Sequence, residues 1–417
     1  DGTVDIEYKV EEKRGGRVGL GGGWGGGRIV GTLGLSFNNF SMKNIFKPES
    51  WSPLPTGDGQ KFSIRAQTNG IYYQSYNISF TEPWLGGKKP NSLSVSGFFS
   101  MFNTTGAKKY VNDDEGNKIR NPNRSTMKII GGSVGFGKRL KKPDDFFSIY
   151  TEASYNYYEL ENYPYFILAN GYANDFNGKI NITRNSVDAP IFPKNGSNFS
   201  ILGQFTPPYS LFNGKNYETA TAAEKFKFIE YQKYKFTAEW FTQLTNKRAG
   251  EGKEARNLVL RTKIGYGILG MYNSKVGVSP FERYYMGGSG LSGYQNFVAR
   301  EIIALRGYTD NSLSSTSGDP LCARYTMELR YPISLNPQAT IFVLGFAEAG
   351  NTWARYKDFN PFQVKRSAGF GLRVFLPMFG LLGLDYGWGF ENIPGNTGSG
   401  NGQGQFHFTL GAQLGEL

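Results

Sequence analysis

A glycine-rich run near the start of the 417-residue chain is the first pattern that could do chemistry. Residues 21–26 (GGGWGG) satisfy the G-x-G-x-x-G spacing of a dinucleotide fingerprint. Such a fingerprint holds a pyrophosphate only where a strand leads into it and a helix opens on it. Neither a helix nor a ribose-binding acid follows here. We therefore interpret the run as a glycine-rich strand and turn, and we expect no cofactor.

Side chains for metal or nucleophilic chemistry are scarce. The chain has one cysteine, Cys322, and one histidine, His407, which exclude an internal disulfide and leave little for a zinc site. The acidic run 112–116 (NDDEG) has calcium-binding residue types without the full loop spacing, so we interpret it as a solvated loop tip. No nucleophile elbow or phosphate-binding loop is present. The sequence predicts a protein that is not an enzyme and holds no metal.

One constellation of charges remains. Arg306 lies in the long connection 269–321, and Glu328 and Glu348 lie on the two predicted strands that follow it. An arginine on a loop that folds back onto these strands could make bidentate, charge-assisted hydrogen bonds to both carboxylates. The alternative is that all three are ordinary solvated charges, because exposed ion pairs are common and weak. Spacing alone leaves both interpretations open.

The elements that must position these residues are strands, because apolar and polar residues alternate at successive positions along almost the whole chain. In 60–69 (QKFSIRAQTN) and 323–331 (ARYTMELRY), apolar and polar residues alternate strictly. Strict alternation indicates a strand with one apolar and one polar face. No segment has a convincing amphipathic helical pattern. The sequence predicts sixteen strands: 15–24, 28–38, 60–69, 72–82, 92–103, 126–139, 146–159, 174–186, 197–206, 229–243, 256–268, 322–333, 339–350, 366–376, 380–391 and 405–414.

The lengths and faces of these strands favour a membrane. Several have about ten residues, the length that crosses a bilayer as a tilted strand. Short turns alternate with long polar connections such as 104–125 and 207–228, which is typical of outer-membrane barrels. A barrel also removes the open sheet edges that a soluble sheet would have to protect. The charges fall on the presumed inner face: Lys61, Arg65, Lys233, Lys235, Arg261, Lys263, Arg324, Arg330 and Arg373.

Composition excludes other classes. With 33 Phe, 26 Tyr and 6 Trp, the chain has too much apolar surface to be disordered. The longest weakly polar run, 374–384, contains Pro377 and is too short for a spanning helix. The net charge of +12 would suit nucleic acid, but no recognisable nucleic-acid-binding module appears, so we expect no such partner. The fold class is therefore all-β, a sixteen-stranded antiparallel transmembrane β-barrel.

Residues 1–13 differ from the rest. Their apolar residues alternate with charged ones, which indicates a strand whose outer face lies in water. We interpret 1–13 as the end of a preceding soluble domain and 14–417 as the barrel, with 269–321 as its longest loop.

Six segments, in this order along the chain, resemble motifs of the BamA family of outer-membrane assembly factors. They are 80–85 (FTEPWL), 284–288 (YYMGG), 305–308 (LRGY), 327–333 (MELRYPI), 346–350 (FAEAG), and the group 371–373, 377–378 and 384–386 near the end. Three features depart from the family pattern. Residues 289–304 separate the second and third motifs, Glu348 stands where the family has Asp, and the chain ends at Leu417 without a terminal aromatic residue.

The resemblance assigns roles to named residues. It implies that 1–13 end the last POTRA domain and that 269–321 is loop six, folded into the lumen. The anchor of loop six would comprise Arg306, Gly307, Glu328 and Glu348. A lateral gate between the first and last strands would comprise Gly19, Leu20, Gly21, Gly22, Gly23, Phe406, Phe408, Leu410, Gly411 and Leu414.

The resemblance also implies a function. The protein would be an insertase in the outer membrane of a Gram-negative bacterium, with a periplasmic N-terminus, that folds client barrels by lateral gating and strand templating. Its partners would be unfolded outer-membrane β-barrel proteins, accessory outer-membrane lipoproteins, membrane lipid and lipopolysaccharide. Two alternatives remain open: a secretion transporter or narrower assembly factor on the same fold, and an anion-selective diffusion porin. For the glycine-rich first strand we favour the gate, and the alternative is a flexible junction to the preceding domain.

Overall fold

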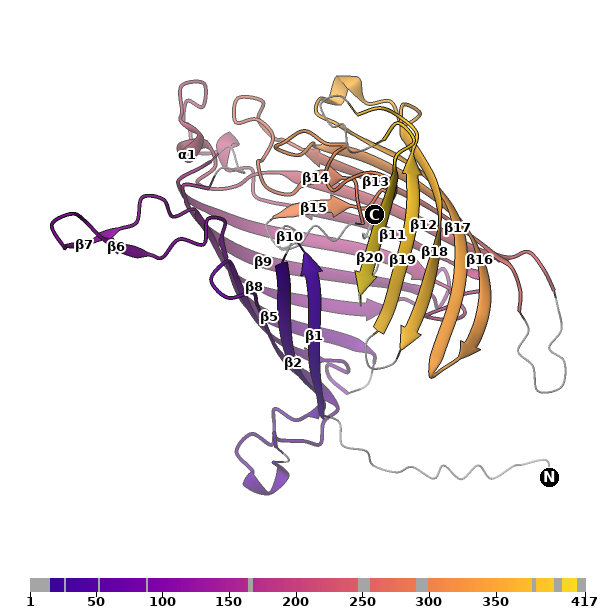
Figure 1. Ribbon diagram of the computed structural model, residues 1–417. Coiled ribbons are helices and arrows are strands. Elements are labelled where there is room, and N and C mark those ends of the chain that lie inside the picture. The colour runs from indigo at the N-terminus through magenta and orange to yellow at the C-terminus, as the bar shows by residue number, and fades with distance from the viewer. Residues whose placement is uncertain are drawn as a thin grey trace.

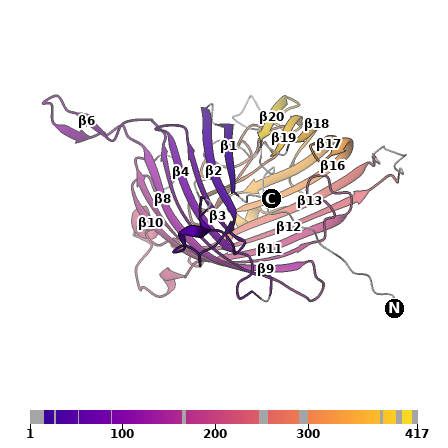
Figure 2. The ribbon, with the colours of Figure 1, turned by 90° about the horizontal axis from the view of Figure 1, so that it is seen from below.

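The computed structural model describes most of the chain: residues 16–25, 28–51, 53–87, 89–163, 168–246, 256–289, 299–376, 380–393 and 400–410. Sixteen of the strands form one antiparallel sheet in which almost every strand pairs with its neighbour along the chain. The sheet curves round until its two edge strands face each other (Figures 1 and 2). The predicted all-β class is confirmed.

Each predicted range overlaps one strand of this sheet. The first half comprises β1 (Gly16–Gly25), β2 (Arg28–Phe40), β3 (Gln60–Thr68), β4 (Tyr73–Glu82), β5 (Asn91–Asn103), β8 (Thr126–Arg139), β9 (Phe147–Glu161) and β10 (Gly171–Asn185). The second half comprises β11 (Gly196–Phe205), β12 (Gln232–Gln243), β13 (Val259–Gly270), β16 (Leu321–Asn336), β17 (Ala339–Trp353), β18 (Lys365–Leu376), β19 (Gly380–Gly389) and β20 (Gly404–Leu410).

The remaining elements lie in the connections. A hairpin of β6 (Tyr110–Asn112) and β7 (Lys118–Arg120) projects from the rim, and α1 (Ala222–Lys225) is a single capped turn. Within 269–321, β14 (Arg283–Met286) pairs in parallel with β15 (Arg300–Ile303). The short 3₁₀ turns are Pro48–Ser50, Tyr209–Leu211 and Tyr356–Asp358. In the part of the chain that the structure describes, no helix is long and apolar enough to cross a membrane.

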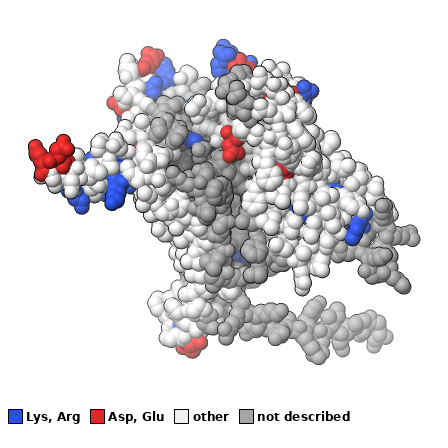
Figure 3. Space-filling view, in the orientation of Figure 1, with Lys and Arg blue, Asp and Glu red and all other residues white. Residues whose placement is uncertain are grey.

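Apolar side chains lie on the outer face of the sheet and charged ones on its inner face, which is the reverse of the arrangement in a soluble protein. On β16, Met327 is 53% exposed on the outer wall, while its neighbour Glu328 is 1% exposed inside. Phe370 and Phe406 likewise lie exposed on the outside. Figure 3 shows a wall largely without charged side chains, with charges mainly at the upper rim and on the β6–β7 hairpin. An apolar exterior around a polar interior is typical of a barrel whose outer solvent is lipid.

The sheet has two edges, β1 and β20. β1 pairs with β2 from Gly16 opposite Phe37 to Gly25 opposite Arg28, and β20 pairs with β19. Among the described residues no hydrogen-bonded ladder joins β1 to β20. Gly19 to Gly23 of the predicted gate lie on β1, and Phe406, Phe408 and Leu410 lie on β20. Gly411, Leu414 and the predicted soluble segment 1–13 lie outside the described residues.

Candidate functional site

The tip of the 269–321 connection, loop six, lies against the inner wall formed by β16 to β20. Arg306 is fully buried. Its Nη2 lies 2.8 Å from Glu328 Oε1 and 2.7 Å from Glu348 Oε1, and its Nη1 lies 3.3 Å from Asp385 Oδ1. The backbone N–H of Arg306 also donates to Glu348 Oε2 at 2.9 Å. Glu348 therefore holds both the side chain and the main chain of Arg306.

Strand register explains why these carboxylates meet. In the β16–β17 ladder, Glu328 lies opposite Phe346 and Thr326 lies opposite Glu348, so the two acids are diagonal neighbours on the inner face. The Arg306 guanidinium carbon lies 3.7 Å from the centre of the Phe346 ring. This cation–π contact fixes the plane of the guanidinium between its acidic partners.

Further arginines surround the three carboxylates. Glu328 also accepts from Arg330 at 2.6 Å and lies 3.1 Å from Arg261, whereas Glu348 accepts from Arg324 at 2.8 Å. Asp385 binds both terminal nitrogens of Arg373, at 2.9 and 2.8 Å. Buried charges require this degree of compensation, because an unpaired one would cost several kcal/mol.

The Arg306 guanidinium remains charged in this setting. Burial lowers its pKa, but the three carboxylates outweigh burial and raise the pKa above its ordinary value. The cluster can therefore act as a permanent ionic lock between the loop and the wall.

Gly307 allows the loop to touch the wall. Its φ of +89° lies in the left-handed region, and a Cβ there would lie 2.7 Å from the carbonyl carbon of Trp388. Its N–H donates to His407 Nε2 at 3.0 Å. On the wall itself, a Cβ on Gly387 would lie 3.0 Å from the Gly307 nitrogen. Glycines on both surfaces thus permit a backbone-to-backbone approach that any side chain would block.

Tyr308 completes the contact between the tip and the wall. Its buried hydroxyl lies 2.7 Å from the backbone oxygen of Arg366 and 2.9 Å from Glu391 Oε2. Burial raises the pKa of this hydroxyl, so it stays protonated and can donate. Three consecutive residues of loop six are therefore attached to β18, β19 and β20.

A second attachment joins loop six to β12. Lys233 Nζ lies 2.9 Å from Glu282 Oε2 and 2.6 Å from Glu301 Oε2, and Lys235 also pairs with Glu301. Burial raises the pKa of Glu301, but the two ammonium groups outweigh burial and hold the pKa at about 2. Because Glu282 precedes β14 and Glu301 lies in β15, these pairs hold the β14–β15 ladder against β12.

The structure brings together all four residues predicted for the loop-six anchor, Arg306, Gly307, Glu328 and Glu348. Glu348, which is one methylene longer than the Asp of the family pattern, contacts both the backbone N–H and Nη2 of Arg306. Sequence reasoning did not assign Asp385, Phe346 or His407 to this site. Phe346 and Asp385 stand in two of the motif segments, 346–350 and 384–386, which gave a signal that was not used for this site; His407 had only its inner-face parity, which many other residues share. Residues 290–298, within the insertion between two motifs, lie outside the described residues.

Comparison with known proteins identifies the family. Residues 56–414 match the model of the Omp85 superfamily domain, and this match covers most of the chain. The chain therefore belongs to the Omp85 superfamily. Membership indicates an outer-membrane β-barrel protein that is either a barrel insertase or a secretion transporter. No curated protein sequence matches this chain.

Solved structures support the same fold. BamA from Haemophilus ducreyi lacking POTRA domains 1–3 is 20% identical, with a TM-score of 0.62, over 96% of this chain and 70% of that one. CdiB from Escherichia coli is 12% identical, with a TM-score of 0.53, over 92% and 60% of the two chains. CdiB from Acinetobacter baumannii is 11% identical, with a TM-score of 0.52, over 94% and 58%. At these identities the likeness establishes the shared fold, and it agrees with the resemblance found in the sequence motifs.

Proposed function

We propose that this chain is the membrane domain of an insertase that folds β-barrel proteins into the outer membrane through a lateral gate between β1 and β20. The observation that carries the proposal is the composition of β1, which contains six glycines in ten residues. Glycine weakens a strand because it has no side chain to pack and loses more entropy on ordering. A weakly held edge strand is a liability in a passive pore, but it is useful where an edge must open.

The mechanism requires only backbone chemistry. When β1 parts from β20, its free N–H and C=O groups can pair with an incoming client strand, as in other cases of β-augmentation. The client gains hydrogen bonds and buries apolar surface in lipid, so its own folding supplies the driving force. β20 is the partner that β1 leaves and later meets again. No nucleotide, metal or catalytic residue takes part.

Loop six has a supporting role in this proposal. Arg306, with Glu328, Glu348 and Asp385, ties the loop tip to β16, β17 and β19, and the Gly307 N–H reaches β20. These contacts would hold the last strands as a fixed wall while β1 opens. Arg306 is thus a positioning residue that keeps one side of the gate in place.

The proposal extends to location and partners. The clients are unfolded outer-membrane β-barrel proteins, and accessory outer-membrane lipoproteins, membrane lipid and lipopolysaccharide complete the working assembly. The N-terminus lies in the periplasm, where residues 1–13 would end the last POTRA domain. The long connections 104–125 and 206–231 would then lie on the outer surface.

A reconstitution assay tests this function. The full-length protein in proteoliposomes should accelerate the protease-resistant folding of a small unfolded barrel protein relative to protein-free liposomes. A secretion transporter, the second candidate because CdiB shares the fold, would instead move a passenger polypeptide across the bilayer without inserting barrels. Large, steady, anion-selective conductance without assembly activity would make the protein a porin and contradict the proposal.

A further inference from the structure

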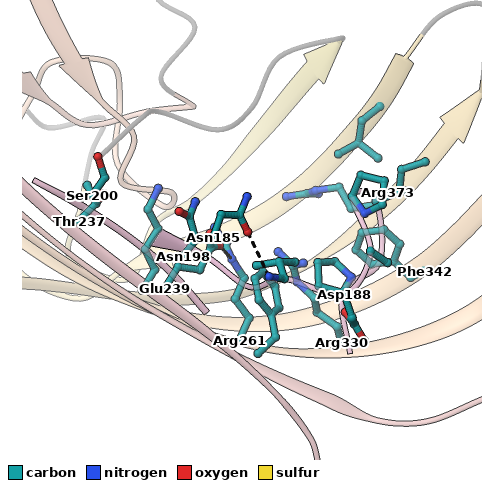
Figure 4. A pocket seen from close by; sticks show the side chains of 18 of the residues that line it. Asn185, Asp188, Asn198, Ser200, Thr237, Glu239, Arg261, Arg330, Phe342 and Arg373 are labelled. Carbon is teal, nitrogen blue, oxygen red and sulfur yellow. Dashed lines mark hydrogen bonds and ion pairs between the residues drawn. The ribbon is translucent and has the colours of Figure 1, made fainter. Parts of the chain in front are cut away.

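A cavity of about 710 Å³ lies in the lumen beside the Arg306 cluster (Figure 4). One wall carries neutral amide and hydroxyl groups, including Asn181, Asn198, Ser200 and Thr237. The lining also carries five cations, contributed by β12, β13, β16 and β18, and the carboxylates of Asp188 and Glu239. The cations are Lys235, Arg261, Lys263, Arg330 and Arg373. We call this space the basic chamber.

The β10–β11 turn, residues 186–195, forms part of the chamber wall by folding into the lumen. Phe192 is buried and packs against Phe342, with ring centres 5.1 Å apart. The Asp188 carboxylate accepts hydrogen bonds from the backbone N–H groups of Lys194 and Asn195 and so is satisfied within its own turn. The turn therefore contributes apolar surface and shape to the chamber, together with the negative charge of Asp188, whose two oxygens are hydrogen-bonded within the turn.

Four of the five chamber cations already have acidic partners. Arg261 pairs with Glu239 and Glu328, and Arg330 pairs with Glu328. Arg373 pairs with Asp385, and Lys235 with Glu301. Lys263 is different.

The side-chain ammonium of Lys263 forms no hydrogen bond or ion pair with any residue that the structure describes, although its backbone pairs within the sheet. Across the ladder from Lys263, Glu239 is engaged by Arg261 at 2.5 Å. Arg261 and Arg324 repel the Lys263 ammonium, and each does so more strongly than Glu239 attracts it. An anion beside Lys263 would therefore relieve repulsion as well as gain attraction.

We propose that the basic chamber binds a carboxylate-bearing polypeptide segment, with Lys263 as the counter-ion of the carboxylate. The amide and hydroxyl wall offers both donors and acceptors to peptide groups. Phe241, Phe342 and Leu381 offer apolar contact to neighbouring side chains. The volume lies within the roughly 300–1,000 Å³ typical of small-molecule pockets, which suits a few residues of extended chain better than a lipid with several acyl chains.

The Arg330 guanidinium prepares this site. It lies 5.5 Å from the centre of the Phe241 ring and 5.6 Å from that of Phe342, and Glu328 holds two of its nitrogens. A cation fixed in this way can donate its remaining N–H groups without losing side-chain entropy on binding. This inference rests on the proposed function, because a client polypeptide is the ligand: the chamber would retain an acidic client segment on the luminal side while the gate works.

Peptide binding to the full-length protein in detergent tests the inference. The probe is a short fluorescent peptide in which glutamate alternates with valine, and its counterpart has glutamine in place of glutamate. Fluorescence anisotropy should give a dissociation constant roughly tenfold higher for the glutamine peptide. Lys263→Gln should weaken binding of the glutamate peptide by a similar factor, and Lys263→Arg should retain it. The matched control is Lys141→Gln, at an exposed residue of the turn after β8, which should leave binding unchanged.

The outcomes separate the chamber from the proposed function. Equal binding of the two peptides, or unchanged binding in Lys263→Gln, would overturn the chamber assignment. If the glutamate peptide does not bind while inorganic phosphate does, the site belongs to phosphate and the polypeptide assignment is wrong. Client assembly by the unsubstituted protein is scored in parallel in proteoliposomes: its absence defeats the insertase proposal, whereas assembly without peptide binding defeats the chamber alone. Unchanged heat-modifiable mobility on gels shows that each variant has folded.

Discussion

The first and last strands of the sheet are held in different ways. β20 pairs with β19 on one side, and from inside the barrel its His407 accepts a hydrogen bond from Gly307 of loop six. Its neighbour β19 carries Asp385, which lies beside Arg306. β1 is a glycine-rich strand whose described ladder joins it to β2. β20 is thus supported from inside the barrel by loop six, whereas the contact described for β1 is its backbone ladder with β2. We therefore expect an opening force to part the seam by moving β1.

Removing Arg306 should have the largest effect on stability and on client assembly, because it removes the loop-six contacts that support the last strands. Arg306→Ala leaves Glu328 and Glu348 buried with one partner fewer, and loss of one member of a buried ion pair costs about 3–5 kcal/mol. Urea unfolding in detergent should show this loss, and client assembly should fall with it. The matched control is Arg355→Ala, which removes the ion pair with Asp358 outside the loop-six contacts; its arginine is 77% exposed, so the midpoint should hardly change. Equal midpoints for the two variants would show that the loop-six lock contributes no stability.

Gly307→Ala should have the next largest effect. The new Cβ would meet the backbone of Trp388 and would be held at a φ of +89°, for a combined cost of about 2–4 kcal/mol. Gly116→Ala separates the two causes, because Gly116 has a φ of +83° with open space around it and should cost about 1 kcal/mol. Thermal unfolding measures both. Similar losses for the two glycines would mean that the loop tip is not pressed against the wall.

Lys233→Met should weaken only the attachment of loop six to β12 and leave the Arg306 contacts to the last strands in place. Glu301 has a folded-state pKa of about 2, below its ordinary value near 4.3, so its pairing stabilises the fold fully above that ordinary value. This stabilisation is lost as the pH falls from about 4.3 towards 2. The unsubstituted protein should therefore lose unfolding free energy between pH 6 and pH 3, and Lys233→Met should lose less. Parallel losses in urea titrations at the two pH values would contradict the second attachment.

Stiffening β1 should have the smallest effect on stability. Gly21→Thr raises strand propensity opposite Thr32 and should stabilise the β1–β2 pairing by up to about 1 kcal/mol. If β1 must open, assembly should slow severalfold while hydrogen exchange of the β1 amides also slows. Gly345→Thr, the same substitution on the exposed face of β17, should leave the assembly rate unchanged. Faster assembly in Gly21→Thr would contradict the opening of β1.

Most of the sheet could be predicted from the sequence because each strand carries its own signal. Alternation within about ten residues is local, so β16, with Met327 outside and Glu328 inside, is recognisable without its neighbours. The β14–β15 ladder was missed because each strand has four residues and its partner is distant in sequence. Short strands inside a long loop have no periodicity to detect.

The site was only partly predictable for a related reason. The motif around Arg306 and the parity of Glu328 and Glu348 identified the lock, but Asp385 lies 79 residues beyond Arg306. Its role depends on how the sheet closes in space and on the curvature that brings β19 to the loop. The Lys233 attachment, likewise, requires knowing that loop six crosses the lumen to β12. The segment 384–386 left a local pattern around Asp385, but which group that carboxylate meets is a property of tertiary geometry, and so is the Lys233 contact.

The central claim is that β1 and β20 must separate during client assembly, and a reversible disulfide across the seam tests it most directly. In the full-length protein with Cys322→Ser, Leu20→Cys or Gly22→Cys is combined with Phe408→Cys, and the pair that oxidises more completely is kept. Leu20 lies opposite the exposed Leu33 in the β1–β2 ladder, and Gly22 shares its strand parity, so both match the outer-face position of Phe408. Client assembly is then measured in proteoliposomes before and after reduction.

A matched lock serves as the control. Leu33→Cys with Ala66→Cys joins β2 to β3 at directly opposed positions, where no separation is required. The account predicts that the oxidised seam stops assembly, that reduction restores it, and that the β2–β3 lock has no effect. Undiminished assembly by a fully oxidised seam would contradict the lateral gate and favour secretion or conduction through the barrel.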